Sequence, residues 1–160
     1  MQYLALNGFR HSLARYFNSR VTLVNKFNWT TSNAREFAHT IDKPTTLIGF
    51  SDGATACLTI ACHCPHITEI YCHSPMEPPS VKLVGWPPVA LFRTKGDSTP
   101  TFKATKAVFD RLGAQGINSF MTTLAPGPHE PVRDLATFIM RNRNHQFRNC
   151  LPFLPQGLVA

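Results

Sequence analysis

Residues 43–57 read KPTTLIGFSDGATAC, and this stretch decides the fold. Its first part, residues 45–48, is apolar and rich in β-branched side chains after a proline, which predicts a buried strand. Its second part suits a helix. The residues between them fit Gly-x-Ser-x-Gly, in which a sharp turn lifts a serine hydroxyl off the end of a strand. Positions 49 and 53 need glycine for a steric reason: the strained backbone at Ser51 brings strand and helix so close together that a Cβ at either position would obstruct them.

The pattern alone is weak, since small residues also cluster in ordinary turns, and the rest of the chain must support it. The predicted strands are residues 3–6, 21–24, 45–48, 67–72, 89–92 and 117–122, with a short extra segment at 81–84 that Gly85 and the following prolines break. The predicted helices are residues 10–20, 34–41, 54–62, 104–112 and a last helix that begins at Pro131. This alternation predicts an α/β fold, a three-layer α/β/α sandwich around a mostly parallel six-stranded sheet.

Two local signals predict helix ends. Residues 30–33 are N-cap candidates, and Glu36 stands three residues after Asn33 as in a capping box. Gly113 stands where a C-terminal cap belongs after the helix of residues 104–112.

Length and composition predict one globular domain. The chain has 160 residues, of which 43% are apolar and 16% charged, and we expect a single domain over residues 1–144 followed by a tail, residues 145–160. No apolar run approaches the roughly 20 residues that span a bilayer. The N-terminal residues have neither a basic region nor the apolar length of a signal peptide. We therefore expect a cytoplasmic protein.

The charge balance is basic, with a formal net charge of +7. Such an excess can attract nucleic acid, anionic lipid or an acidic substrate. The basic residues are spread along the chain and become dense only in residues 141–148. This spread argues against direct nucleic-acid binding as the main role.

Four polar motifs each follow a predicted strand: Asn7-Gly8, Ser51, Asp97 and His129. Ligands of parallel sheets bind outside the carboxyl ends of the strands, and right-handed crossovers bring those ends to one edge. A serine becomes a nucleophile when a base lies beside it and a third group orients that base. In this fold class the order along the chain is serine, acid, histidine.

That order selects few residues after Ser51. Among the acids, Glu69 lies inside a strand and Asp110 inside a helix, whereas Asp97 follows the fifth strand. Glu77, beyond the fourth strand, is the reserve acid. Among the histidines, His129 follows the sixth strand, and His145 in the basic tail is the weaker candidate. Asp97 has a competing role as the cap of the helix that follows it, at Thr99 or Phe102.

These motifs together resemble the α/β-hydrolase family. Residues 49–54 resemble its nucleophile elbow, residues 96–100 its acid loop and residues 126–130 its histidine loop, over a resemblance that covers about residues 2–142. The turn at residues 7–9 resembles the His-Gly turn that supplies one oxyanion amide, with asparagine in place of histidine. The resemblance implies a triad of Ser51, Asp97 and His129, with the backbone N–H groups of Phe9 and Asp52 as the oxyanion donors.

The chain also departs from the family pattern. It begins at what would be the third strand, so we expect six strands in the order 2-1-3-4-5-6. The passage of residues 74–88 is too short for a helical cap, which predicts a cap-less site with Met76 and Trp86 near its rim. Thr94 stands where the acid loop usually carries glycine, which slightly weakens the case for Asp97.

The resemblance implies a serine hydrolase that acts on a small carboxylic ester or thioester and needs no metal or diffusible cofactor. Asn7, Arg10, Met76 and Trp86 are the candidate substrate-lining residues. Arg10, Arg93 and Lys95 follow strand ends and would favour an anionic substrate, with plain solvation of exposed charges as the preferred explanation. The first strand is either buried by this chain alone or pairs with a second subunit, which leaves a homo-oligomer open.

Two other functions compete with hydrolysis. The first is a non-catalytic binding module on a degenerate α/β-hydrolase scaffold, which would hold a protein or nucleic acid on its basic surface. The second is redox or metal chemistry at the cysteines and histidines of residues 57–73. Their spacing fits no two-plus-two zinc knuckle, and an odd total of five cysteines favours free thiols, so we expect no metal site.

Overall fold

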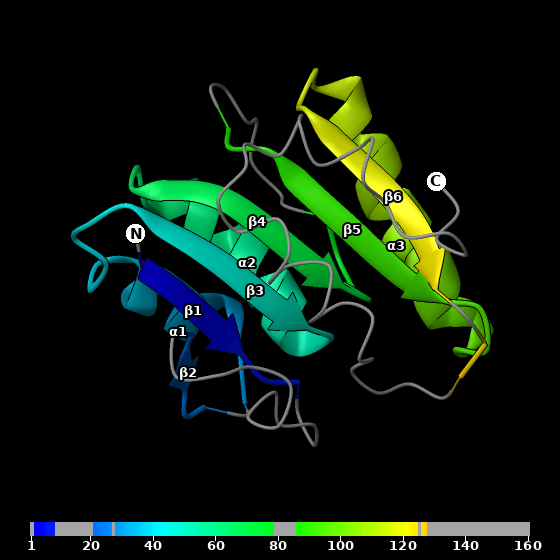
Figure 1. The fold of residues 1–160 in the computed structure, drawn as a ribbon, viewed down its shortest axis with the longest axis horizontal. Coiled ribbons are helices and arrows are strands. Elements are labelled where there is room, and N and C mark those ends of the chain that lie inside the picture. Colours follow the sequence, from blue (N-terminus) through cyan, green and yellow to red (C-terminus); the bar gives the residue numbers. More distant parts are fainter. Residues whose placement is uncertain (1, 9–20, 27, 79–85, 125, 128–160) are drawn as a thin grey trace.

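The computed structural model describes residues 2–8, 21–26, 28–78, 86–124 and 126–127. Their centre is one sheet of six strands, all parallel to their neighbours. The strands are β1 Gln2–Leu6, β2 Thr22–Val24, β3 Thr45–Phe50, β4 Ile67–His73, β5 Val89–Thr94 and β6 Ser119–Leu124. They lie in the order β2-β1-β3-β4-β5-β6 (Figure 1), which confirms the predicted order 2-1-3-4-5-6.

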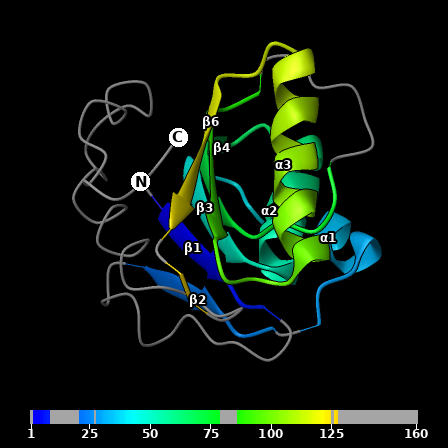
Figure 2. The same cartoon turned by 90° about the vertical axis from the view of Figure 1, so that its right-hand side faces the viewer.

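The described helices form one layer. They are α1 Thr31–Ala38, α2 Asp52–His63 and α3 Thr99–Ala114. Figure 2 shows all three on the same face of the sheet. The helices predicted for residues 10–20 and after Pro131, which would cover the other face, lie outside the described residues, as does the extra segment at 81–84. The α/β class and the parallel sheet are confirmed, and the third layer stays a prediction.

Strand β3 and helix α2 form the centre of the core. All six residues of β3 are buried, and Leu47, Ile48 and Phe50 are fully buried. The strand pairs with β1 on one side and β4 on the other. Helix α2 packs on it through small residues, including Ala54 and Cys57. Because β3 is buried on both faces, its sequence is a continuous apolar run rather than an alternating one.

The helix ends differ in detail from the sequence signals. Helix α1 has Thr30 as its N-cap and Asn33 at the third helical position, with the Thr30 hydroxyl and the Asn33 side chain each bonded to the other's backbone N–H. The capping box is therefore Thr30–Asn33, and the predicted Asn33–Glu36 pair is wrong. Helix α3 runs past Gly113, and the left-handed backbone comes at Gly116, with φ of 72°. Helix α3 ends at Ala114, two residues after the predicted end at residue 112, so the left-handed residue lies beyond Gly113.

No helix in the described part of the chain has the length and apolar character that would let it cross a membrane.

One glycine lets β1 and α2 come into contact. A Cβ built at Gly53 would overlap the carbonyl oxygen of Leu6 and would lie 2.5 Å from that of Asn7. These oxygens belong to backbone and cannot move as a flexible side chain could. The first turn of α2 therefore rests directly on the end of β1.

We predict that Gly53→Ala lowers the free energy of unfolding by at least about 2 kcal/mol, because the added methyl forces backbone apart in a packed core. Gly113→Ala is the matched control, since a Cβ there meets nothing within 4 Å. Gly113 is the second-last residue of α3, so the change should stabilise the protein by no more than about 0.5–1 kcal/mol. Urea denaturation of both variants measures the difference, and equal stabilities would rule out the close contact.

Candidate active site

Ser51 sits in strained backbone between β3 and α2. Its φ is 56° and its ψ is −118°, whereas most non-glycine residues avoid positive φ. Its N–H donates to the carbonyl of His73 at 2.8 Å, and its own carbonyl accepts from the N–H of Thr55 at 3.0 Å. The hydroxyl makes no capping bond to helix α2. The backbone is therefore anchored on both sides while the side chain is not used to start the helix.

Gly49 and Gly53 allow this turn. A Cβ at Gly49 would lie 2.5 Å from the carbonyl oxygen of Gly53. The steric role predicted for the two glycines of Gly-x-Ser-x-Gly is thereby confirmed. The end of β1 is also close, because a Cβ at Gly8 would lie 2.8 Å from the ring of Phe50 and 3.2 Å from its carbonyl oxygen.

The predicted oxyanion donors lie on these two neighbouring segments. Asp52 is the first residue of α2, so its N–H is among those that have no partner within the helix. Phe9 directly follows Gly8, but Phe9 and Arg10 lie outside the described residues. Asn7 is fully buried, and its side-chain amide donates to the carbonyl of Val24 at 3.4 Å.

The acid loop follows β5. One carboxylate oxygen of Asp97 accepts from the N–H of Ser98 at 2.7 Å, and the other accepts from the hydroxyl of Ser74 at 3.4 Å. The N-cap of α3 is Ser98, so Asp97 stands one residue before the cap. A Cβ at Gly96 would lie 2.5 Å from the carbonyl oxygen of Gly127, which brings the acid loop against the segment after β6. His129 comes two residues later in the chain and lies outside the described residues, as does His145.

Three buried polar side chains, those of His73, Ser74 and Thr94, support this loop, and the sequence patterns predicted this role for none of them. The Nε2 atom of His73 is 2.9 Å from the hydroxyl of Thr94, joining the last residues of β4 and β5. Ser74, with φ of 56° and 1% exposure, is the other non-glycine residue with positive φ among those described. A polar residue at the end of an otherwise apolar strand was the signal available in the sequence.

A cavity of about 190 Å³ opens beside the elbow. Its walls come from residues 29–31, from one face of residues 52–59 and from residues 76–77, which follow the carboxyl ends of β2, β3 and β4. Met76 lines it and is held there by a bond of 2.8 Å from its N–H to the hydroxyl of Thr55. Glu77, the reserve acid, lines this cavity too. Trp86 is half-buried and packs against the core.

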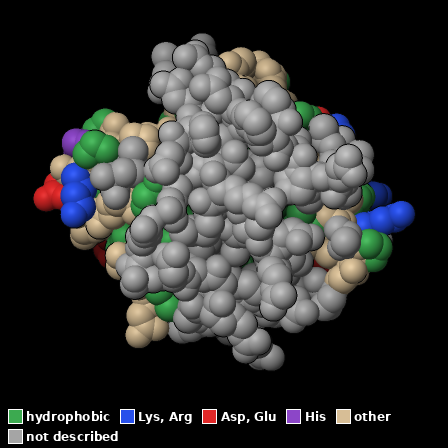
Figure 3. Space-filling view, in the orientation of Figure 1, with side chains coloured by type: hydrophobic (Ala, Val, Ile, Leu, Met, Phe, Trp, Pro, Cys, Tyr) green, Lys and Arg blue, Asp and Glu red, His purple; other side chains and the backbone are tan. Residues whose placement is uncertain are grey.

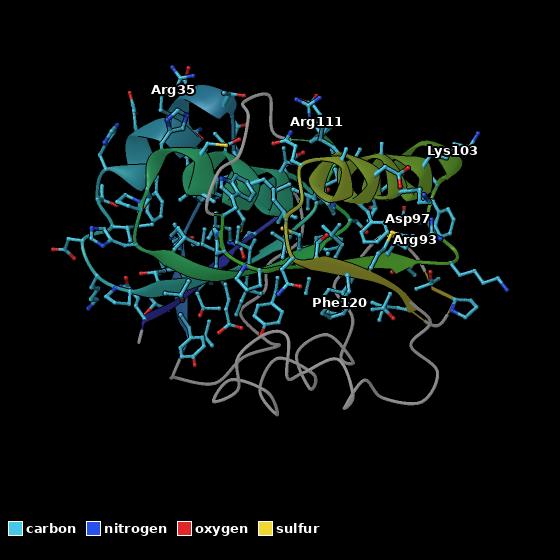
Figure 4. All side chains as sticks on the ribbon, turned by 90° about the horizontal axis from the view of Figure 1, so that it is seen from above. Arg35, Arg93, Asp97, Lys103, Arg111 and Phe120 are labelled. Carbon is cyan, nitrogen blue, oxygen red and sulfur yellow. The ribbon has the colours of Figure 1, made fainter. Side chains whose placement is uncertain are left out.

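The basic residues near the strand ends have ordinary structural contacts. The guanidinium of Arg93 lies 3.9 Å from the centre of the Phe102 ring, and its Nε donates to the hydroxyl of Thr123 at 3.1 Å. Desolvation lowers the pKa of Arg93. Figure 4 shows Arg93 and Asp97 at the same end of the sheet beside α3, with Phe120 on the face away from the helices. Lys95 is exposed.

The cysteines of residues 57–73 are free thiols in packed surroundings. Burial and the neighbouring Cys72 raise the pKa of Cys57, and burial raises that of Cys62 to about 11. Such thiols carry little thiolate at neutral pH, and thiolate is the form that binds metals. Within the described residues, no three His, Cys, Asp or Glu side chains are grouped so that they could hold a metal ion.

Comparison with known proteins supports the fold. Neither a protein-family model nor a curated protein matches the sequence. Among solved structures, a carboxylesterase from Bacillus cereus matches with a TM-score of 0.63 and 16% identity, over 88% of this chain and 87% of that one. SOBER1 from Arabidopsis thaliana matches with a TM-score of 0.66 and 13% identity, over 88% and 96%. Esterase PE8 matches with a TM-score of 0.61 and 16% identity, over 89% and 91%.

The chain therefore has the α/β-hydrolase fold, and the resemblance seen in the sequence is confirmed at that level. Identities this low show the fold alone. The triad and the oxyanion donors stay predictions that rest on the geometry of this chain.

The strain at Ser51 can be measured with two substitutions that both remove the hydroxyl. Ser51→Gly also removes the Cβ that positive φ disfavours, whereas Ser51→Ala keeps it. Backbone strain of this kind costs about 1–3 kcal/mol, which Ser51→Gly relieves. Glycine also has more freedom than alanine in the unfolded chain, which lowers the stability of Ser51→Gly by about 0.5–1 kcal/mol. We predict that Ser51→Gly is about 1 kcal/mol more stable than Ser51→Ala in urea denaturation. If Ser51→Ala were the more stable of the two, the turn would not be strained.

Proposed function

We propose that this chain is a serine hydrolase that cleaves a carboxylic ester or thioester. The observation that carries the proposal is the strained backbone of Ser51 at the carboxyl end of the central strand. A glycine would make the same turn at lower cost, so a serine there implies a use for its hydroxyl. The esterases among the structural neighbours support the same class of reaction.

In the proposed reaction, Ser51 Oγ attacks the carbonyl carbon and its proton passes to His129, which Asp97 orients. The oxyanion that forms accepts from the N–H groups of Asp52 and Phe9, and each such donor lowers the barrier by roughly 3 kcal/mol. Collapse of the intermediate breaks the C–O or C–S bond, and His129 returns the proton to the leaving group. Water then attacks the acyl-enzyme by the same steps. No metal or diffusible cofactor takes part in this scheme.

Ser74 has a positioning role in this proposal. Its hydroxyl lies 3.4 Å from the second oxygen of the Asp97 carboxylate, a weak hydrogen bond from a buried, strained position that favours one orientation of the group. The first oxygen is held by the N–H of Ser98. With both oxygens engaged, the carboxylate is held in one rotamer and can orient an imidazole without reorganising.

Several finer expectations remain part of the proposal. The cytoplasmic location and a homo-oligomer rest on the sequence alone, as does the absence of a cap. An anionic substrate is the alternative that Arg10, Arg93 and Lys95 would favour over plain solvation of their charges, and of these Arg93 is engaged with Phe102 and Thr123. The binding-module alternative also stays open: on the face drawn in Figure 3, Lys and Arg side chains of the described residues lie at two opposite edges.

A fluorophosphonate probe tests the nucleophile directly. We expect it to label the wild-type chain and not Ser51→Ala, because it reacts with an activated serine hydroxyl. A panel of p-nitrophenyl esters and thioesters of increasing chain length should be hydrolysed, with kcat/KM reduced at least about 10³-fold in Ser51→Ala. Equal labelling of both proteins, or of neither, would falsify the mechanism. Salt-sensitive binding of a partner that survives Ser51→Ala, without turnover, would favour the binding module.

One variant distinguishes a role of Ser74 in positioning Asp97 from a role in stability. Ser74→Gly removes the hydroxyl that contacts Asp97 and also relieves a positive φ of 56°. We predict that Ser74→Gly unfolds at a urea concentration no lower than the wild type, yet has a kcat lowered about fivefold with little change in KM. A merely structural serine would instead leave kcat unchanged.

A further inference from the structure

The segment after β4 carries the serine that contacts the acid, and it is held to the sheet at its start. Ser74, whose hydroxyl lies 3.4 Å from a carboxylate oxygen of Asp97, is 1% exposed and has a φ of 56°. Its N–H donates to the carbonyl of Phe92 in β5 at 2.8 Å. A non-glycine residue keeps such a backbone conformation only where its surroundings impose it. A second attachment beyond Ser74 would hold the strained residue from both sides.

The hydroxyl of Thr55 in α2 supplies this second attachment. Its oxygen accepts from the N–H of Met76 at 2.8 Å, a distance typical of a well-formed hydrogen bond. The two residues are 21 positions apart in the sequence, so the bond joins α2 to the segment after β4. Ser74 therefore lies between two bonded amides, its own and that of Met76.

The same threonine is bonded to the turn that carries the proposed nucleophile. Its N–H donates to the carbonyl of Ser51 at 3.0 Å, and its hydroxyl lies 3.4 Å from the same oxygen as a weaker second bond. A hydroxyl can donate one hydrogen bond and accept two. The Thr55 hydroxyl thus donates to the Ser51 side and accepts from the Met76 side. One side chain bridges the turn of the nucleophile and the segment that contacts the acid.

We infer that Thr55 is a positioning residue of the proposed triad. Its hydroxyl acts on the acid, Asp97, through the short segment from Ser74 to Met76. The inference rests on the proposed function, because it concerns how the acid of that triad is oriented. Loss of the hydroxyl removes the acceptor of the Met76 amide and lets Ser74 turn away from the carboxylate. The Ser51 carbonyl keeps its bond from the backbone N–H of Thr55, so the turn of the nucleophile stays in place.

Helix α2 also offers a matched control. Thr59 stands one turn after Thr55, is half-buried like it and lines the same cavity, but its hydroxyl bonds to the Thr55 carbonyl within the helix, at 3.4 Å. Thr55→Val and Thr59→Val each remove one hydroxyl from the same wall and keep the β-branched shape. The difference between them therefore reports the bond to Met76. Thr55→Ser keeps the hydroxyl, and Thr55→Ala removes it with the residue that helices accept best.

The bond is tested first without any turnover, by hydrogen exchange of the Met76 amide in the full chain, followed by NMR. We expect exchange at least about tenfold faster in Thr55→Val and Thr55→Ala than in the wild type, because the amide loses its acceptor. Thr55→Ser and Thr59→Val should exchange at the wild-type rate. An unchanged rate in both Thr55→Val and Thr55→Ala overturns the inference.

Turnover of a p-nitrophenyl ester is tested second, with and without Ser74→Gly. We expect Thr55→Val to lower kcat about threefold relative to Thr59→Val with little change in KM, and Thr55→Ser to recover it. Because the effect passes through Ser74, Thr55→Val should change kcat by less than about 1.5-fold in the Ser74→Gly background.

The kinetic outcomes separate this inference from the hydrolase function. Equal kcat values in Thr55→Val and Thr59→Val overturn the inference while the hydrolase function stands. Losses that multiply in the double variant of Thr55→Val and Ser74→Gly do the same, since Thr55 would then act by another route. A wild type that hydrolyses no ester and takes no fluorophosphonate overturns the hydrolase function, and the positioning role with it.

Discussion

Three stretches of backbone meet at Gly53 with no side chain between them, and the rest of the structure depends on that contact. The first turn of α2 rests on the carbonyls at the end of β1, while Gly49 at the end of β3 lies against Gly53 itself. Because these segments are so close, the chain can turn from strand to helix only through a residue at positive φ. The strain at Ser51 is therefore maintained by packing around it, as strained functional residues generally are.

At the carboxyl ends of the strands, polar contacts also join each strand end to its neighbour. The His73–Thr94 pair joins β4 to β5, and Ser74 joins the end of β4 to Asp97 in the loop after β5. Gly96 then brings that loop against Gly127 after β6. Each contact links one strand end to the next, so the positions of the serine and the acid are set by the sheet rather than by flexible loops.

The sequence was sufficient for the strands and the elbow, because each depends on a local pattern, whereas the strand order came from the resemblance to the α/β-hydrolase family. An apolar run identifies β3, and a glycine on either side of Ser51 identifies the turn. The cap of α1 was misplaced because residues 30–33 are all capable of capping and only packing selects Thr30. The end of β4 carried a polar signal, but the contact of Ser74 with Asp97 and the cavity depend on the register of β4 against β5 and on the meeting of segments that are distant in the chain. His129 and Phe9 lie outside the described residues, so their roles remain those that the resemblance implies.

The position of β1 in the sheet has a consequence for how the chain acquires its fold. Leu4 of β1 lies opposite Thr22 of β2 on one side and opposite Leu47 of β3 on the other. The central pairing thus closes a loop of more than forty residues, and parallel pairings of this span are slow to form. In a chain that is synthesised from its N-terminus, β1 can pair with β3 only after β3 has been made. Until then its sole neighbour in the described sheet is β2, which has three residues. Among the neighbouring strand pairs of the described sheet, β1 and β3 are the two that lie farthest apart in the sequence, so their pairing is the one whose loop closure costs most.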